Sequence, residues 1–327
     1  MFKRILIVGF GSIGKRHLSV IQGFLPGAEK LVLKKSSPFT EQIPGVSFTN
    51  NEEKAISYRP EIAVIANPAP FHIEIATKLA KNGCHLLIEK PVTVVDYDVN
   101  PLLEEIRSKG VVCQVGYNLR YFQSLRKFKN LIDEELIGKV YSIRCEVGQY
   151  LPSWRPETDY REGVSAQKFL GGGVLNELSH EIDYLQWIFG EINWVRGWSG
   201  KVSDLEIDVE DLASITMGLK HSSASDESIV SLTLDFIRHD RTRHCTVIGS
   251  EGTLKWDGTD GSVALFKRGS SDWQNLYSSS TDEVSKSYYL QCKDFIDCIK
   301  HNTSPLVNLK VATQVVKIVS MIRNMKI

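Results

Sequence analysis

The 327-residue sequence lacks a net charge, because 39 Lys and Arg residues balance 39 Asp and Glu residues. A neutral chain produces no global field that would attract nucleic acid or an anionic membrane. The sequence also lacks any apolar run that approaches the length of a bilayer span. We therefore expect neither nucleic acid nor a membrane among the partners of this protein.

The sequence contains no C-x-x-C pair, and its six cysteines stand within apolar patterns that predict strands or helices. This arrangement favours buried thiols in a reducing compartment over a disulfide framework or a zinc site, so no metal is expected. The chain enters a strand-like run directly, which leaves no room for a signal peptide. These features predict a cytoplasmic protein.

A chain of this length has room for two cores, and its pattern changes about one third of the way along. Residues 1–120 alternate short apolar strands with amphipathic helices, which is typical of a parallel sheet covered on both faces. The expected strands are Ile5–Val8, Lys30–Leu33, Ile62–Ala66, His85–Glu89 and Val112–Val115, and the expected helices are Lys15–Phe24, Phe71–Asn82 and Val99–Lys109.

Residues 121–327 differ, because their strands mostly alternate apolar and polar residues between Gly, Ser and Asp turns. This pattern predicts an α+β domain for substrate binding and oligomerisation, with a large, mostly antiparallel, open-faced sheet. Helices should cover the sheet, and the last is also a candidate to pack back on the first domain. The expected strands are Val140–Val147, Asp211–Leu219, Ile229–Ile237, His244–Ile248, Thr253–Trp256 and Val263–Phe266, and the expected helices are 121–136, 174–189, 285–301 and 311–324.

A glycine-rich turn, Gly9-Phe10-Gly11-Ser12-Ile13-Gly14, stands directly between the first strand and the first helix. In a dinucleotide-binding unit the first Gly makes the turn, the second admits the pyrophosphate and the third lets helix and strand pack closely. The N–H groups of the first helical turn, at Ser12 and Ile13, then face the phosphate charge. The turn predicts a Rossmann α/β domain over residues 1–120; an ordinary strand–turn–helix is the alternative.

The end of the second strand predicts which nicotinamide cofactor binds. An acidic residue there would bind the ribose 2′-hydroxyl of NAD, but the chain carries Lys34, Lys35, Ser36 and Ser37. Cations followed by hydroxyls suit the additional 2′-phosphate of NADP. We predict NADP, bound through Lys34, Lys35 and Ser36, with NAD as the alternative; a solvated charge pair is the structural alternative.

Two further motifs carry candidate chemistry. Glu89-Lys90-Pro91 follows a strand at the edge where open α/β sheets bind ligands, although Lys90 could instead extend its ammonium to the surface. The second motif is a Gly171-Gly172-Gly173 run before the predicted helix 174–189. At about 100° per residue, Asn176, His180 and Asp183 share one stripe, so we expect a helix that presents this polar row opposite a buried apolar face.

Together these motifs resemble the glucose–fructose oxidoreductase / inositol dehydrogenase (Gfo/Idh/MocA) family over essentially the whole chain. The resemblance implies an NAD(P)-dependent enzyme that transfers a hydride between nicotinamide and a hydroxyl or keto carbon of a sugar. It places Lys90 beside nicotinamide and substrate, with Pro91 often in cis, and makes His180 the proton-transfer residue. The segments that carry it are Gly9–Gly14, Asn67–His72, Glu89–Pro91, Gly116–Arg120, Gly171–Asp183 and Gly249–Leu254.

The resemblance also assigns binding roles. In oxidation His180 would accept the hydroxyl proton while Lys90 stabilises the alkoxide, although these two roles can be exchanged. The predicted cofactor contacts are the glycine-rich turn, Asn67, Pro68, His72, Glu89, Lys90 and Asn118. The predicted substrate contacts in the same cleft are Tyr117, Arg120 and Asp183.

One position departs from the family pattern. Family dehydrogenases often carry Asp four residues before the His, where this chain has Asn176. Either Glu177, about 60° away around the helix, supplies the carboxylate near the substrate, or the site works with Asn176. An amide cannot stabilise an imidazolium as a carboxylate does.

Specificity is expected from a loop of the second domain that contains Tyr150, Trp154, Arg155 and Arg161. Aromatic faces suit sugar C–H surfaces, and Arg suits a carboxylate or phosphate. The loop resembles those of family members from bacterial surface-sugar pathways, which implies an anionic or nucleotide-activated, nonulosonate-like sugar. A folded surface loop held by cation–π contacts is the alternative.

Other functions stay open at this point. The same fold serves non-catalytic regulators that sense NADP, and related families include glycosidase-like enzymes that keep NAD tightly bound. The resemblance further implies a homodimer or homotetramer formed through the C-terminal sheet.

Overall fold

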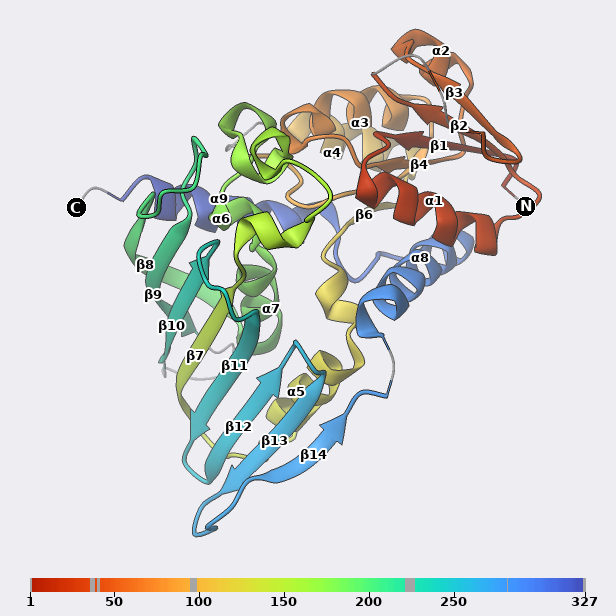
Figure 1. Cartoon of the computed structure of the whole chain (residues 1–327). Coiled ribbons are helices and arrows are strands. Elements are labelled where there is room, and N and C mark those ends of the chain that lie inside the picture. Colours follow the sequence, from red (N-terminus) through yellow and green to blue (C-terminus); the bar gives the residue numbers. More distant parts are fainter. Residues whose placement is uncertain are drawn as a thin grey trace. The chain divides into compact units, whose positions relative to one another are not determined.

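The computed structural model describes residues 2–35, 39, 42–94, 99–220, 227–280 and 282–325. The chain divides into two compact units (Figure 1). The first unit comprises Met1–Tyr117 and Tyr288–Val316, and the second comprises Asn118–Ser287 and Lys317–Ile327. The unit that contains the glycine-rich turn therefore also contains a segment from near the end of the chain.

The first unit contains a six-stranded parallel sheet in the order β3-β2-β1-β4-β5-β6. The strand order reverses at β1, and open α/β sheets bind ligands at the carboxyl ends of the strands at such a point. The strands are β1 (Arg4–Val8), β2 (Glu29–Leu33), β3 (Val46–Thr49), β4 (Ile62–Ile65), β5 (His85–Ile88) and β6 (Cys113–Val115). The helices are α1 (Ser12–Phe24), α2 (Glu52–Ser57), α3 (His72–Lys81) and α4 (Asn100–Lys109).

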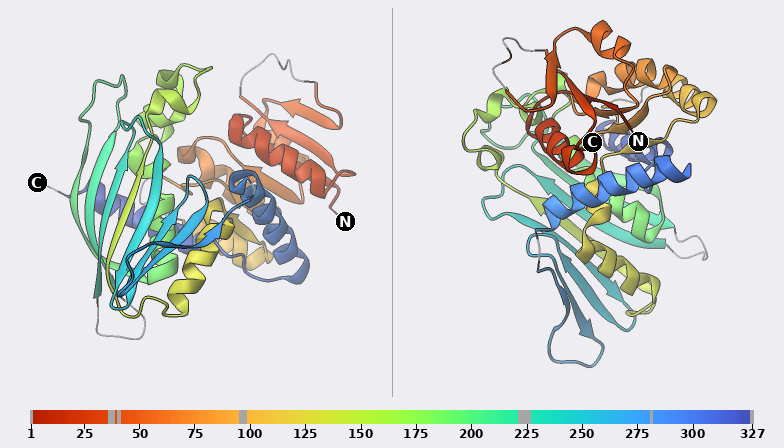
Figure 2. Two further views of the ribbon diagram at one scale, coloured as in Figure 1. Left: turned by 60° about the horizontal axis from the view of Figure 1, so that its bottom comes forward. Right: turned by 90° about the vertical axis from the view of Figure 1, so that its right-hand side faces the viewer.

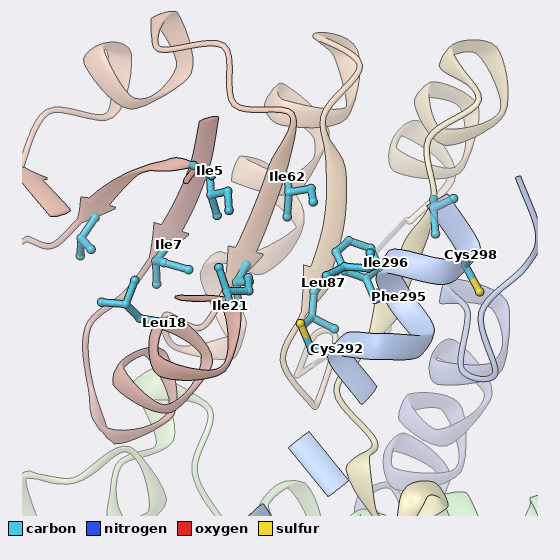
Figure 3. Close-up of a cluster of buried hydrophobic side chains, with 14 of the residues drawn as sticks. Ile5, Ile7, Leu18, Ile21, Ile62, Leu87, Cys292, Phe295, Ile296 and Cys298 are labelled. Carbon is cyan, nitrogen blue, oxygen red and sulfur yellow. The ribbon is translucent and has the colours of Figure 1, made fainter. Parts of the chain in front are cut away.

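One face of this sheet is covered by α1 and by the long helix α8 (Glu283–His301). Figure 3 shows Phe295 of α8 beside Leu87 of β5, within the cluster that also holds Ile7 and Ile21. The prediction that helix 285–301 covers the antiparallel sheet is therefore wrong. Its apolar stripe shows that the helix must be buried but does not specify which sheet buries it.

The opposite face of the parallel sheet is also covered. Side chains alternate between the two faces of a strand, and Leu6 and Ile65, which lie outside the α1–α8 cluster, are fully buried too. Helix α3 contacts β4 and β5 and packs against α4. The sheet is thus covered on both faces, as the continuous apolar strands predict.

The second unit contains an eight-stranded sheet in the order β14-β13-β12-β11-β7-β10-β9-β8 (Figure 1). Figure 2 shows the same large sheet from two further sides. Every neighbouring pair is antiparallel except β7 and β10, which confirms the mostly antiparallel sheet. The strands are β7 (Val140–Gly148), β8 (Glu191–Gly200), β9 (Leu212–Lys220), β10 (Glu227–Asp235), β11 (Thr242–Gly249), β12 (Gly252–Asp257), β13 (Ser262–Lys267) and β14 (Gln274–Ser278).

Alternation along β10 shows how this sheet is packed. Val230, Leu232 and Leu234 are fully buried, whereas Ser231 between them is exposed. Helix α5 (Gln123–Asp133) contacts the β12–β14 end of the sheet, and two short helices near residues 174–189 contact β9 and β10. The second unit also includes the end of α9 (Leu309–Arg323).

Among the α-helices and strands of the described residues, four do not appear among the predicted ones: β3, α2, β8 and β14. Each is short, half-exposed or interrupted by Gly and polar residues, so its pattern is weak. All six cysteines are buried thiols, as predicted. Within the described ranges, no helix combines the length and apolar character needed to cross a membrane.

Candidate active site

Backbone atoms crowd the first and last glycines of the glycine-rich turn, whereas the space beside the middle glycine is open. Gly9 has φ +89°, and a Cβ there would lie 2.6 Å from Ala66 O and Asn67 N. A Cβ on Gly14 would lie 2.2 Å from Gly9 O, whereas a Cβ on Gly11 would meet no atom within 4 Å. Helix α1 begins at Ser12 without an acidic residue in its first turn. The turn therefore fits a nucleotide pyrophosphate at the helix N-terminus.

The two predicted phosphate-binding lysines follow β2 beside this turn. Gly9 N–H donates to Leu33 O at 2.9 Å, and Lys34 N–H donates to Thr49 O at 2.9 Å. The Lys35 ammonium lies 4.6 Å from the centre of the Phe71 ring. Ser36 lies outside the described residues. Two cations thus stand where the adenosine ribose of a dinucleotide is expected, and their binding role remains a prediction.

The segment Glu89-Lys90-Pro91, here called the Lys90 turn, follows β5. Its Lys90–Pro91 peptide bond is cis, in line with the family expectation. Glu89 is buried, and its Oε2 accepts from the Lys90 N–H at 3.2 Å. Its Oε1 lies 2.6 Å from His17 Nε2. Burial alone would raise the pKa of the Glu89 carboxyl, but the contact with His17 and the charge of Lys90 lower the pKa below its usual value.

Sequence reasoning missed His17. A signal for it is present, because His17 shares the buried face of α1 with Gly14, Leu18 and Ile21 at helical spacing. A polar residue on an apolar helix face needs a buried partner. Glu89 is that partner.

His72 holds the other side of the same turn. Its Nε2 lies 2.7 Å from Asn67 O, and its Nδ1 lies 3.1 Å from Pro91 O. Burial lowers the pKa of this imidazole. His72 therefore connects the loop after β4, which contains Asn67 and Pro68, to the loop after β5. Cofactor contacts by these three residues remain predictions.

In the second unit, the predicted helix 174–189 is broken into α6 (Val174–Glu177) and α7 (His180–Phe189). Ser179 Oγ donates to Asn176 O at 2.9 Å, a local bond that competes with helical hydrogen bonding. The prediction of one continuous helix is wrong. His180 is the first residue of α7 and is half-exposed.

Asn176 uses its side-chain amide to hold the glycine run. The amide nitrogen donates to Gly171 O at 2.9 Å and to Gly172 O at 3.3 Å, and the residue is buried. A carboxylate could not donate these bonds. The departure from the family Asp therefore has a local structural role, while Glu177 is half-exposed at the end of α6.

Asp183 is also buried, so the predicted helix face does not present a polar row. Arg120 Nε and Nη2 donate to its two carboxylate oxygens at 2.8 and 2.7 Å. Burial raises the pKa of Asp183, and the Arg120 charge opposes that shift. A cation from another segment thus pairs with Asp183 in the interior, which a helical wheel does not show. Contacts of Arg120 and Asp183 with substrate remain predictions.

The other residues predicted near the site differ in exposure. Tyr117 is fully buried, and Asn118 is buried with its Nδ2 donating to Ser287 Oγ at 2.8 Å. Glu181, next to His180, is buried, and its Oε1 lies 2.9 Å from Arg243 Nε. The first turn of α7 is thus anchored by two acid–arginine pairs, Glu181–Arg243 and Asp183–Arg120.

The side chains of the predicted specificity loop contact both the loop itself and other segments of the second unit. Trp154 Nε1 donates to Gln149 O at 3.0 Å, and the Tyr150 ring lies 4.4 Å from the His239 ring. Arg161 is exposed and pairs with Asp159 and Glu206. Arg155 is exposed. The aromatic and cationic groups are present in one loop, and their substrate role remains a prediction.

Comparison with known proteins identifies the family. Residues 3–117 match the model described as "Oxidoreductase family, NAD-binding Rossmann fold", and residues 125–255 match "GFO/IDH/MocA C-terminal domain". The chain belongs to the Gfo/Idh/MocA family. It is a nicotinamide-dependent oxidoreductase.

Three of the similar proteins match nearly the whole chain. The scyllo-inositol 2-dehydrogenase (NAD(+)) of Bacillus subtilis (strain 168) is 24% identical over 322 residues, with 93% of this chain and 88% of that protein covered. Levoglucosan dehydrogenase in complex with NADH has a TM-score of 0.82 at 19% identity, covering 98% and 96% of the two chains. The WlbA dehydrogenase from Bordetella pertussis in complex with NADH and UDP-GlcNAcA has a TM-score of 0.79 at 18% identity, covering 99% and 97%. At these identities the solved structures show a shared fold.

Replacing Asn176 with Asp should destabilise the protein, even though the family resemblance leads us to expect Asp at this position. The change removes two donated hydrogen bonds and places a carboxylate against two carbonyl oxygens, at a cost of about 1–3 kcal/mol. The folded state should raise the new carboxyl's pKa. The deficit should therefore be smallest near pH 4, about the ordinary Asp pKa, and grow toward neutral pH.

Urea unfolding at several pH values measures this effect. Asn82→Asp is the matched control, because the exposed Asn82 amide also donates to a helix carbonyl, at 2.9 Å from Lys78 O. The control should change the free energy of unfolding by less than about 0.5 kcal/mol. Equal effects of the two substitutions would contradict the proposal that the Asn176 amide holds the glycine run.

Proposed function

We propose that this protein catalyses reversible hydride transfer between NADP(H) and a hydroxyl or keto carbon of a sugar. The main supporting observation is the Lys90 turn. It follows β5 at the ligand-binding edge of the sheet and is held by buried groups on both sides, Glu89 with His17 and His72. The nicotinamide, when bound, supplies the hydride acceptor or donor. The protein's own residues must then manage the hydroxyl proton and the charge on oxygen.

We assign these tasks to Lys90 and His180. The Lys90 Nζ offers a positive charge to the oxygen that becomes an alkoxide during oxidation. The His180 imidazole accepts the proton from that hydroxyl and returns it during reduction. His180 is the first residue of α7 and is half-exposed, so its imidazole is not sealed in the core.

The cofactor proposal is NADP, with NAD as the alternative. Lys34 and Lys35 follow β2 directly, and the sequence has no carboxylate between Leu31 and Thr40 to bind a 2′-hydroxyl. Ammonium groups at the end of β2 would bind the 2′-phosphate of NADP through charge-assisted hydrogen bonds. The relatives named with NAD or NADH show that the family also uses the cofactor without that phosphate.

The proposed substrate is an anionic or nucleotide-activated sugar. The loop with Tyr150, Trp154, Arg155 and Arg161 combines flat aromatic rings with guanidinium groups. Such groups suit sugar C–H faces and carboxylate or phosphate oxygens. The fold shared with a dehydrogenase bound to UDP-GlcNAcA supports this choice. A cytoplasmic location and a homodimer or homotetramer through the open sheet face are proposed as well.

Replacing Lys90 with Ala should lower kcat by about 100-fold or more, because an electrostatic stabiliser of the transition state is removed. The Kd for NADPH, measured by fluorescence titration, should change by less than about threefold. Lys81→Ala, an exposed lysine at the end of α3, is the control and should leave kcat unchanged. An unchanged kcat in Lys90→Ala would refute the role of Lys90.

Replacing both Lys34 and Lys35 with Ala should weaken NADPH binding by about 10–100-fold, the loss expected for charge-assisted hydrogen bonds. NADH binding should change little, because NADH lacks the 2′-phosphate. Lys54→Ala on α2 provides the control, since Lys54 is exposed and follows β3 instead of β2. If the wild-type protein binds NADH more tightly than NADPH, the NADP proposal is wrong.

Sugar acids should be turned over in preference to neutral polyols. We expect kcat/KM for a nonulosonate or a UDP-linked sugar acid to exceed that for inositols at least tenfold, a difference of about 1.4 kcal/mol. Arg155→Ala should reduce this preference, with Arg59→Ala in the first unit as the control. Turnover of neutral polyols without turnover of the acids would exclude the anionic substrate.

A further inference from the structure

We propose that His17 and Glu89 form a positioning pair that fixes Lys90 relative to the glycine-rich turn. The inference rests on the proposed function, because it gives Lys90 its role, but it assigns a task to two residues that do not perform the chemistry themselves. All the groups involved belong to the first unit.

The geometry connects the two motifs through three groups. His17 lies on α1, three residues after Gly14 of the glycine-rich turn, and its Nε2 is 2.6 Å from Glu89 Oε1. The second oxygen of Glu89 accepts the backbone N–H of Lys90 at 3.2 Å. One carboxylate therefore joins the first turns of α1 to the backbone of the catalytic candidate.

The surroundings are built to hold that carboxylate. Glu89 and His17 are 7% and 1% exposed, so solvent contributes little to their interaction. A Cβ on Gly116 would lie 2.9 Å from Glu89 Oε2, so the glycine leaves the space in which the carboxylate sits. The Tyr288 ring packs edge-on against the His17 ring at 5.4 Å and restricts its rotation.

A rigid carboxylate here does more than satisfy a buried charge. On one side of Lys90, its backbone N–H donates to Glu89. On the other side, the carbonyl oxygen of Pro91 lies 3.1 Å from His72 Nδ1. The backbone on both sides of Lys90 is thus fixed by buried groups. Catalytic groups lose efficiency when they are displaced by about 1 Å, so a fixed backbone is what an electrostatic stabiliser requires.

Two measurements separate positioning from general stability. The first is acetic anhydride labelling of lysines in the protein without nucleotide, read by peptide mass spectrometry with the exposed Lys109 as internal reference. The second measurement determines kcat and the Kd for NADPH. The variants are His17→Leu, Glu89→Gln and the double substitution, with Lys90→Ala measured in parallel.

We expect His17→Leu to raise Lys90 labelling at least threefold relative to Lys109, because the turn loses one of its two anchors. kcat should fall about 10–100-fold, while the NADPH Kd stays within about threefold. The double variant should resemble either single one, since two residues that act as a unit are not additive. His17→Gln, whose terminal amide can donate from the place of Nε2, should restore most of kcat.

His85→Leu is the matched control. His85 begins β5, and its Nδ1 accepts the Val112 N–H at 3.0 Å, so this change also removes a histidine and a hydrogen bond from the same unit. It should leave Lys90 labelling and kcat unchanged. Equal effects of His85→Leu and His17→Leu would overturn the inference in favour of general destabilisation.

The outcomes also separate this inference from the proposed function. Unchanged Lys90 labelling in His17→Leu and Glu89→Gln overturns the positioning pair, whatever happens to kcat. Increased labelling together with normal turnover in Lys90→Ala supports the pair and refutes the catalytic role of Lys90. If His17→Leu does not fold because Glu89 loses its partner, Glu89→Gln and His17→Gln decide the same question.

Discussion

The close contact of Gly9 with the loop after β4 is the constraint on which the nucleotide-binding edge depends. Any side chain at Gly9 would collide with the backbone of Ala66 and Asn67, and its φ of +89° is one that glycine adopts readily. Because β1 and β4 are parallel neighbours at the point where the strand order reverses, this contact sets the spacing of the two loops that follow them. The N-terminus of α1 and the Asn67 loop are both positioned by it.

Paired buried carboxyl groups recur beside the motifs of this enzyme. Glu89 pairs with His17 in the first unit, and Asp183 and Glu181 pair with arginines in the second. An unpaired buried charge is costly, so each pair has only a narrow range of favourable geometries. Such pairs contribute less to stability than apolar burial does, but they define where the neighbouring backbone lies. The backbone of Lys90 and the first turn of α7 are both defined in this way.

The sequence predicts the local parts of this fold well and the long-range parts poorly. The glycine-rich turn, the apolar strands and the alternating strand β10 follow from patterns within a few residues, and the structure confirms them. Three features depend on residues 60 or more positions away in the sequence. They are the sheet against which α8 packs, the partner of Asp183 and the role of His17. A helical wheel identifies a polar stripe but cannot show that Arg120 pairs with Asp183 in the interior. For the same reason, the roles of Lys90 and His180 come from resemblance and chemistry, not from spacing.

Helix α8 has a consequence for the synthesis of the protein. Its residues Cys292, Phe295 and Ile296 complete the core that begins with Ile5 and Ile7. During translation, the amino-terminal sheet must therefore wait for almost the entire polypeptide to leave the ribosome before the part of that face under α8 is covered. Until then, that part of the sheet is available to chaperones, and a fragment ending near residue 120 would keep it exposed permanently.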